Sequence, residues 1–194
     1  MNPELAQTPH DLQQLQRLLA EATAAIAPDY FLLPVANAGD AEPLLRYRER
    51  VYAYELYHQL RSNWPDAWPY SLAGEIDKGG HPIVRGGLLD SAKPDLLVHI
   101  PGKMDSNLAV IEIKPFRARG STDERERFQR DIQKLVAFRR PPARYALAIF
   151  LVFGNGIERA QGYGRDLQQG GTGIDEVQLW HHPGSGQHAA MAPW

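Results

Sequence analysis

The sequence predicts an α/β fold in which helices flank a mixed central sheet, and three observations indicate it. Apolar runs at 95–100 and 108–114 are joined by a short polar connection, which is typical of a hairpin of two strands. A third apolar run at 144–153 follows an amphipathic segment at 124–140, and a helix between strands favours a parallel crossover. With a first strand at 70–78 and a helix before it, the predicted core has the order αβββαβ.

Composition limits the protein to a few classes. The 194 residues can build one domain with a substantial core, and 43% hydrophobic with 23% charged residues is ordinary for a soluble globular protein. The net charge is −2, so a surface that binds nucleic acid must be local. The absence of cysteine excludes disulfides, thiolate metal sites and a cysteine nucleophile. No apolar run approaches the roughly 18 residues of a membrane span, and no secretion signal is visible, so we expect a cytoplasmic protein.

The elements before the sheet are predicted to be helical. A helix from Thr8 to about Ala27 has proline in its first turn and one apolar stripe, and with the following loop it forms an N-terminal extension, 1–42, packed on the core. A second, deeply packed helix is expected at 43–63. Tryptophan and proline residues end it, and the first strand, 70–78, follows.

The elements after the hairpin begin with a capping box at 121–124, which predicts the start of a helix. Two prolines, 141–142, stop this helix. The run at 144–153 is apolar throughout, so it should be a buried strand. Alternation over 174–180 predicts a last edge strand, and we expect 183–194 to be a disordered tail.

Three charged residues interrupt the apolar hairpin. Charges in a core cost free energy unless they are paired or hold a metal. Glu112 and Lys114 are two residues apart and share a face, and Asp95 can lie opposite them in the antiparallel pair. Two carboxylates close together favour a hard cation such as Mg²⁺. The competing interpretation is an exposed hairpin that ends in an ordinary Glu–Lys ion pair.

This pattern resembles a known signature. Pro94-Asp95 followed by Glu112-Ile113-Lys114 is similar to the motif of the PD-(D/E)XK nuclease superfamily, and the resemblance covers roughly 45–155. The order of the predicted elements is the one expected of that superfamily. The resemblance therefore implies a restriction-endonuclease-like domain at 43–182.

The resemblance also implies roles for the charged residues. Asp95 and Glu112 would bind Mg²⁺, for which Mn²⁺ can substitute, and the carbonyl of Ile113 would add a ligand. Lys114 would orient the attacking water or help to deprotonate it. Such a metal lowers the pKa of bound water and stabilises charge on the phosphate.

Two further acids are candidates for the same site. Many members of the superfamily have a carboxylate on the helix before the sheet, and Glu55 lies within the apolar surface of that predicted helix. The alternative is a structural Glu55 paired with Arg48 or His58. In the first strand, Glu75 or Asp77 could supplement the metal ligands, and Glu75 is the more central of the two.

A basic helix follows the motif. Ten basic and four acidic residues lie in 114–144, and a basic helix beside carboxylates suits a polyanionic backbone held over a metal. Arg127, Arg130 and Lys134 are the predicted contacts to nucleic acid. The alternative is a solvated helix face with pairs such as Glu126–Arg130.

These observations predict a Mg²⁺-dependent endonuclease that hydrolyses phosphodiester bonds, with DNA as the expected substrate. No separate target-recognition domain is visible, so sequence specificity would need a partner protein or a homodimer. The main alternative is a non-catalytic, nuclease-like module that binds nucleic acid or protein. A third alternative is a metal-dependent phosphoesterase for small substrates, although the basic helix favours a polymer.

Overall fold

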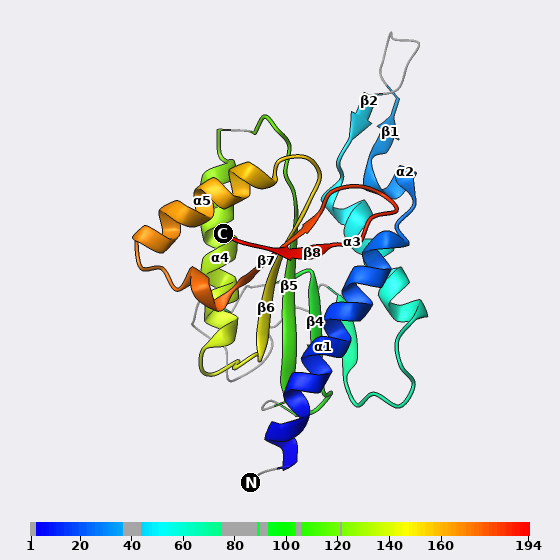
Figure 1. Cartoon of the computed structure of the whole chain (residues 1–194), viewed down its shortest axis with the longest axis vertical. Helices are drawn as coiled ribbons and strands as arrows, with labels where there is room; N and C mark the ends of the chain where they lie inside the picture. The colour runs from blue at the N-terminus through cyan, green and yellow to red at the C-terminus, as the bar shows by residue number, and fades with distance from the viewer. Residues whose placement is uncertain (1–2, 37–43, 75–88, 90–92, 104–105, 121) are drawn as a thin grey trace.

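A six-stranded mixed sheet forms the centre of the protein in this computed structural model, with helices on both faces (Figure 1). The structure describes residues 3–36, 44–74, 89, 93–103, 106–120 and 122–194. The strands are β3 (Ser71–Gly74), β4 (Leu96–His99), β5 (Asn107–Pro115), β6 (Leu147–Phe153), β7 (Gln178–His182) and β8 (Ala190–Ala192), adjacent in that order. β5, β6 and β7 are parallel to one another, whereas the other neighbouring pairs are antiparallel.

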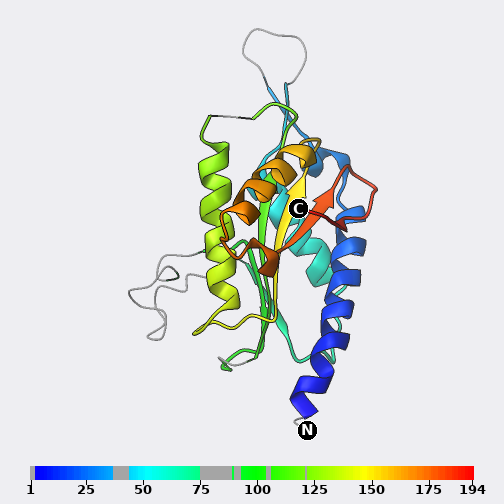
Figure 2. The same ribbon diagram turned by 60° about the vertical axis from the view of Figure 1, so that its left-hand side comes forward.

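The helices form one layer on each side of the sheet, as the rotated view makes clear (Figure 2). The first layer contains α1 (Pro3–Ala24), α2 (Pro28–Phe31) and α3 (Glu49–Ser62). The second layer contains α4 (Glu124–Arg139), α5 (Ile157–Gln169) and the short 3-10 helix η2 (Ile174–Glu176). A separate two-stranded ribbon, β1 (Leu33–Val35) with β2 (Leu44–Arg46), extends from the first layer.

Alternation along β5 divides the core in two. Ile111 and Ile113 pack with the layer of α1 and α3, whereas Val110 packs with the layer of α4. The rings of Tyr52 on α3 and Phe153 on β6 stack with centroids 3.9 Å apart, which joins the first layer to the sheet. Because residues 110, 112 and 114 share one face of β5, the charged residues at 112 and 114 lie on the side of the sheet that α4 covers.

The mixed α/β fold is confirmed, and α3, β3, β4, β5, α4 and β6 follow one another in the predicted order. The predicted crossover is also present, since β6 lies parallel to β5. None of the helices in the described ranges is long and apolar enough to cross a membrane.

The long helix predicted at 43–63 is shorter than expected. Residues 44–46 pair with 33–35 instead, so that Leu33 lies opposite Arg46, and α3 begins only at Glu49. This pairing is not local, and helical periodicity alone cannot reveal it. It moves the start of α3, and therefore the residues that its first turn presents.

The prediction of a disordered tail at 183–194 is wrong. β8 lies antiparallel to β7, so β7 is not the edge strand that was predicted. The tail is held by α1 and the residues just after it: the Ala189 amide donates to Thr23 Oγ1 at 2.8 Å, and Ser185 Oγ donates to the Ile26 carbonyl at 2.7 Å. A segment without hydrophobic periodicity is thus ordered by partners from the other end of the sequence.

Candidate active site

The three residues of the predicted motif meet where β4 and β5 pair. Leu96 lies opposite Ile111, and continuing this antiparallel register places Asp95 opposite Glu112 on the face that α4 covers. Asp95 Oδ2 accepts a hydrogen bond from the Ile113 amide at 2.7 Å. Asp95 is therefore held by the neighbouring strand.

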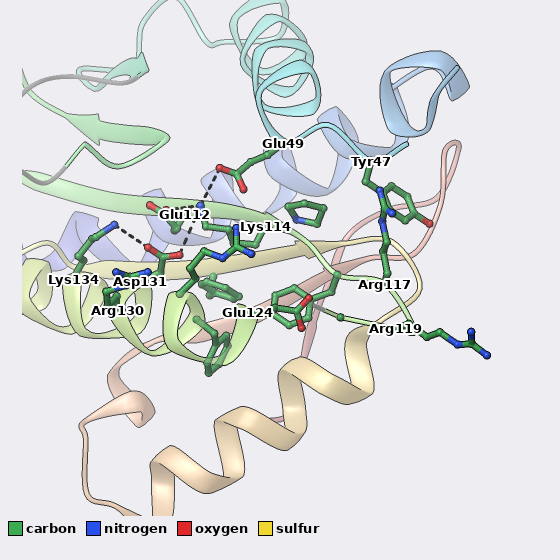
Figure 3. Close-up of a pocket in the computed structure, with 16 residues that line it drawn as sticks. Tyr47, Glu49, Glu112, Lys114, Arg117, Arg119, Glu124, Arg130, Asp131 and Lys134 are labelled. Atoms are coloured by element: carbon green, nitrogen blue, oxygen red, sulfur yellow. Dashed lines mark hydrogen bonds and ion pairs between the residues drawn. The ribbon is translucent and has the colours of Figure 1, made fainter. Parts of the chain in front are cut away.

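The ammonium of Lys114 lies at the centre of a carboxylate cluster (Figure 3). Its Nζ is 2.8 Å from Glu112 Oε1, 3.0 Å from Glu49 Oε1 and 3.7 Å from Asp131 Oδ2. These acids come from three elements: β5, the first turn of α3 and the middle of α4. A single lysine thus connects the sheet to both helical layers.

Burial determines the electrostatics of this cluster. Burial and then the charge of Glu112 raise the pKa of Asp95 to about 7, although Lys114 and the Ile113 amide oppose this shift. Burial also raises the pKa of Glu112, against the stabilising charge of Lys114. For Lys114, burial favours the neutral form, but the carboxylates led by Glu112 and Asp131 outweigh it and raise the pKa above its ordinary value.

The cluster opens into a pocket of about 810 Å³ between the end of β5, α4 and the start of α3. Its acidic lining residues are Glu49, Glu112, Glu124 and Asp131. Its basic lining residues are Lys114, Arg117, Arg119, Arg127, Arg130 and Lys134. The pocket therefore combines a buried acidic end with a larger number of cationic groups, an arrangement that can bind a phosphate and act on it next to carboxylates.

The structure does not bring Glu55 to this pocket. Glu55 Oε1 accepts a hydrogen bond from Gln59 Nε2 at 2.7 Å, whereas Glu49 contacts Lys114. Six positions along a helix separate the two acids by about 9 Å and turn them about 120° apart, so they cannot serve the same pocket. Glu75 lies outside the described residues.

The basic residues predicted on α4 all line the pocket, and two of them have acidic partners. Lys134 Nζ is 2.8 Å from Asp131 Oδ1, and an exposed pair joins Arg127 to Asp123 at 2.6 Å. The alternative pair Glu126–Arg130 does not form in the described part of the chain. Arg130 is exposed at the pocket with its guanidinium available to a ligand.

Sequence reasoning missed Asp131 as a site residue. Its position is three residues after Phe128 and four before Leu135, on the apolar stripe of α4, and only 6% of it is exposed. A charge at a stripe position that should be apolar is a signal that could have found it. Asp131 bridges Lys114 and Lys134, which joins the motif to the basic helix.

Asp95 and Glu112 are the residues that could hold a metal ion, because their carboxylates lie opposite each other and carry raised pKa values. Within the described ranges, no group of three or more His, Asp or Glu side chains is placed to hold one. One of these two carboxylates, Glu112, already pairs with an ammonium, because Lys114 Nζ lies 2.8 Å from its Oε1.

Neither a protein-family model, nor a curated protein, nor a solved structure matches this chain.

Proposed function

We propose that the protein is a Mg²⁺-dependent nuclease with a restriction-endonuclease-like fold, acting on phosphodiester bonds in DNA. The observation that carries the proposal is the Lys114 ammonium among the carboxylates of Glu112, Glu49 and Asp131, at the acidic end of a pocket with basic walls. The order of elements from α3 to β6 supports the fold. Such a pocket can attract a phosphate backbone and place it against a metal ion and a lysine.

The carboxylates of Asp95 and Glu112 and the carbonyl oxygen of Ile113 are the ligands that we propose for Mg²⁺, with Mn²⁺ as a substitute. When bound, such an ion lowers the pKa of a water molecule and stabilises charge on the phosphate. Burial, and after it repulsion from the Glu112 carboxylate, raises the pKa of Asp95 to about 7, and a bound cation would favour the ionised carboxylates. Residues Glu49 and Asp131 keep Lys114 next to these ligands.

Lys114 is better suited to donate protons than to accept them. Its carboxylate neighbours raise its pKa above the ordinary value for lysine, so it stays charged at neutral pH. A charged ammonium can orient a water molecule or stabilise a phosphate oxygen by donating a hydrogen bond. Of the two roles implied by the resemblance, orientation is therefore the one that we propose.

A second candidate is a nuclease-like module that binds nucleic acid without cutting it. The ion pairs of Lys114 with Glu112 and Glu49 favour this candidate, because such pairs can satisfy the buried charges without a metal. The two candidates differ in one measurable respect. Only the nuclease should be stabilised by Mg²⁺ or Mn²⁺ and cut nucleic acid in their presence.

The experiment incubates the protein with plasmid, linear DNA and RNA, with and without Mg²⁺ or Mn²⁺, and records thermal unfolding under the same conditions. Glu112→Gln should remove both cleavage and stabilisation by metal, because it removes a ligand charge. Lys114→Ala should remove cleavage and retain stabilisation by metal, because lysine is not a ligand. Cleavage by Lys114→Ala at the wild-type rate, or no cleavage of any substrate by wild type, would contradict the proposal.

The structure supplies a matched pair of variants for the acid on α3. Glu49→Gln removes a carboxylate that contacts Lys114, whereas Glu55→Gln removes one that contacts Gln59. We expect Glu49→Gln to lower the cleavage rate at least about tenfold, a loss of about 1.4 kcal/mol in transition-state stabilisation. Glu55→Gln should cleave like wild type. If Glu55→Gln lowers the cleavage rate and Glu49→Gln does not, Glu55 is the acid on α3 that serves the site.

A further inference from the structure

The candidate pocket adjoins a second cavity. The neighbouring cavity, about 400 Å³ in volume, lies between the end of β5 and the β1–β2 ribbon. Both cavities are lined by Tyr47, Arg117 and Arg119. The two cavities therefore adjoin, and together, as what we call the trough, they extend from the carboxylate cluster to Leu45 on the ribbon.

Basic groups lie on both sides of the cluster along this trough. In Figure 3, Arg130 and Lys134 lie on one side of Glu112 and Lys114, whereas Arg117 and Arg119 lie on the other. Arg119 is exposed and has no ion pair with any described residue. The guanidinium of Arg117 lies 5.7 Å from the ring centre of Tyr47, a contact that leaves its hydrogen-bond donors available.

This charge distribution suits a strand that continues in both directions. A strand that continues on both sides of the reacting phosphate carries further phosphates in both directions, so cations on both sides of the cluster suit it. Here the trough stays open beyond Lys114, and its cations continue onto Arg117 and Arg119. Arginine is the side chain best matched to phosphate, since its donors form a planar fork.

We propose that a single nucleic-acid strand runs along the trough from α4 to the β1–β2 ribbon, so that the phosphate beside Lys114 is an internal one. The chemistry of this inference rests on the proposed function. A water oxygen forms a bond to phosphorus while the bond from phosphorus to one ester oxygen breaks. That ester oxygen takes a proton, which leaves one phosphomonoester end and one hydroxyl end. The protein therefore cuts inside a strand and needs no free end.

The first test measures binding without divalent metal, so that it does not depend on cleavage. The double variant Arg117→Gln and Arg119→Gln should bind single-stranded DNA about tenfold more weakly than wild type. The slope of log affinity against log salt should become shallower by about 1.4, because each lost contact to a single strand removes about 0.7. The matched control, Arg61→Gln with Arg165→Gln, removes two exposed arginines that line neither cavity and should change neither quantity.

The second test compares circular single-stranded DNA with the same sequence made linear, in Mg²⁺ or Mn²⁺. We expect both to be cut at similar rates. If the linear strand is degraded from its ends while the circle stays intact, the inference is overturned but the nuclease proposal stands. Unchanged DNA binding by the Arg117/Arg119 double variant would have the same meaning. Weakened binding by that variant without cleavage of either DNA would support the path and contradict the nuclease. A wild-type protein that binds no DNA would overturn both.

Discussion

Replacing Asp95 with asparagine should stabilise the metal-free protein, and the gain should appear only at high pH. Burial and the charge of Glu112 raise the pKa of Asp95 from 3.8 to about 7. The folded state thus retains a proton that the unfolded chain releases, so the stability of the wild type falls as the pH rises from about 4 to 7. Asparagine resembles the protonated carboxyl and carries no titrating proton, so the Asp95→Asn protein should not lose this stability as the pH rises.

The size of the effect follows from the shift in pKa. A change from 3.8 to about 7 corresponds to an upper limit of about 4 kcal/mol at pH 9. The Asp95 side chain keeps some access to water, which screens part of this penalty, so we expect a gain of about 2 to 4 kcal/mol. The hydrogen bond from the Ile113 amide can be retained by the amide oxygen of asparagine.

The assay is urea unfolding with a chelator at pH 5 and pH 9. With a typical urea dependence of about 2 kcal/mol/M, the midpoint of Asp95→Asn should exceed that of wild type by about 1 to 2 M at pH 9 and differ much less at pH 5. Asp66→Asn, a change of an exposed carboxyl in a turn, is the matched control and should show no such gain. A stability difference equal at both pH values would refute the reasoning.

Two more predictions concern the packing around the C-terminal strands. Burial lowers the pKa of His182, which binds the hydroxyl of Tyr52, to about 4, so only the unfolded chain takes up this proton between pH 6.5 and 4. Stability should fall by up to about 3 kcal/mol over that range, and the fall should be smaller in His182→Gln when both are measured by urea unfolding. Gly164→Ala should destabilise the protein by about 1 to 3 kcal/mol, because the new methyl group would lie 2.5 Å from the Trp194 ring. In a Trp194→Ala background the same change should be neutral or stabilising, and thermal unfolding of all four proteins checks this; a penalty that persists would contradict it.

The sequence predicted the structure best where a local hydrophobic pattern determines the type and the bounds of an element. β6 is apolar and buried at every position, and the buried residues of α4 follow helical spacing, so both elements were predicted close to their observed bounds. Strand alternation and the hairpin register determine which face of the sheet a side chain occupies. They therefore predict that the side chains of Asp95, Glu112 and Lys114 lie on the same face. Each of these inferences depends on local periodicity.

The errors arose where distant segments decide the structure. α3 starts at Glu49 because 44–46 pairs with 33–35, and this start selects Glu49 over Glu55 as the acid near Lys114. Most of the C-terminal residues are small or polar, with little periodicity of their own. They are ordered by distant partners: β8 pairs with β7, the Ala189 amide donates to Thr23 on α1, and the Trp194 indole donates to the Val177 carbonyl.

The hydrogen bond between Thr23 and Ala189 also has a consequence for how the chain folds during synthesis. It joins residues 166 positions apart, so α1 must wait until residue 189 has been made before this contact can form. Until then β7 lacks its outer partner, and an unpaired strand edge is a template for association with other chains. We therefore expect nascent chains that are interrupted before residue 189 to be the ones most prone to aggregate and to require chaperones.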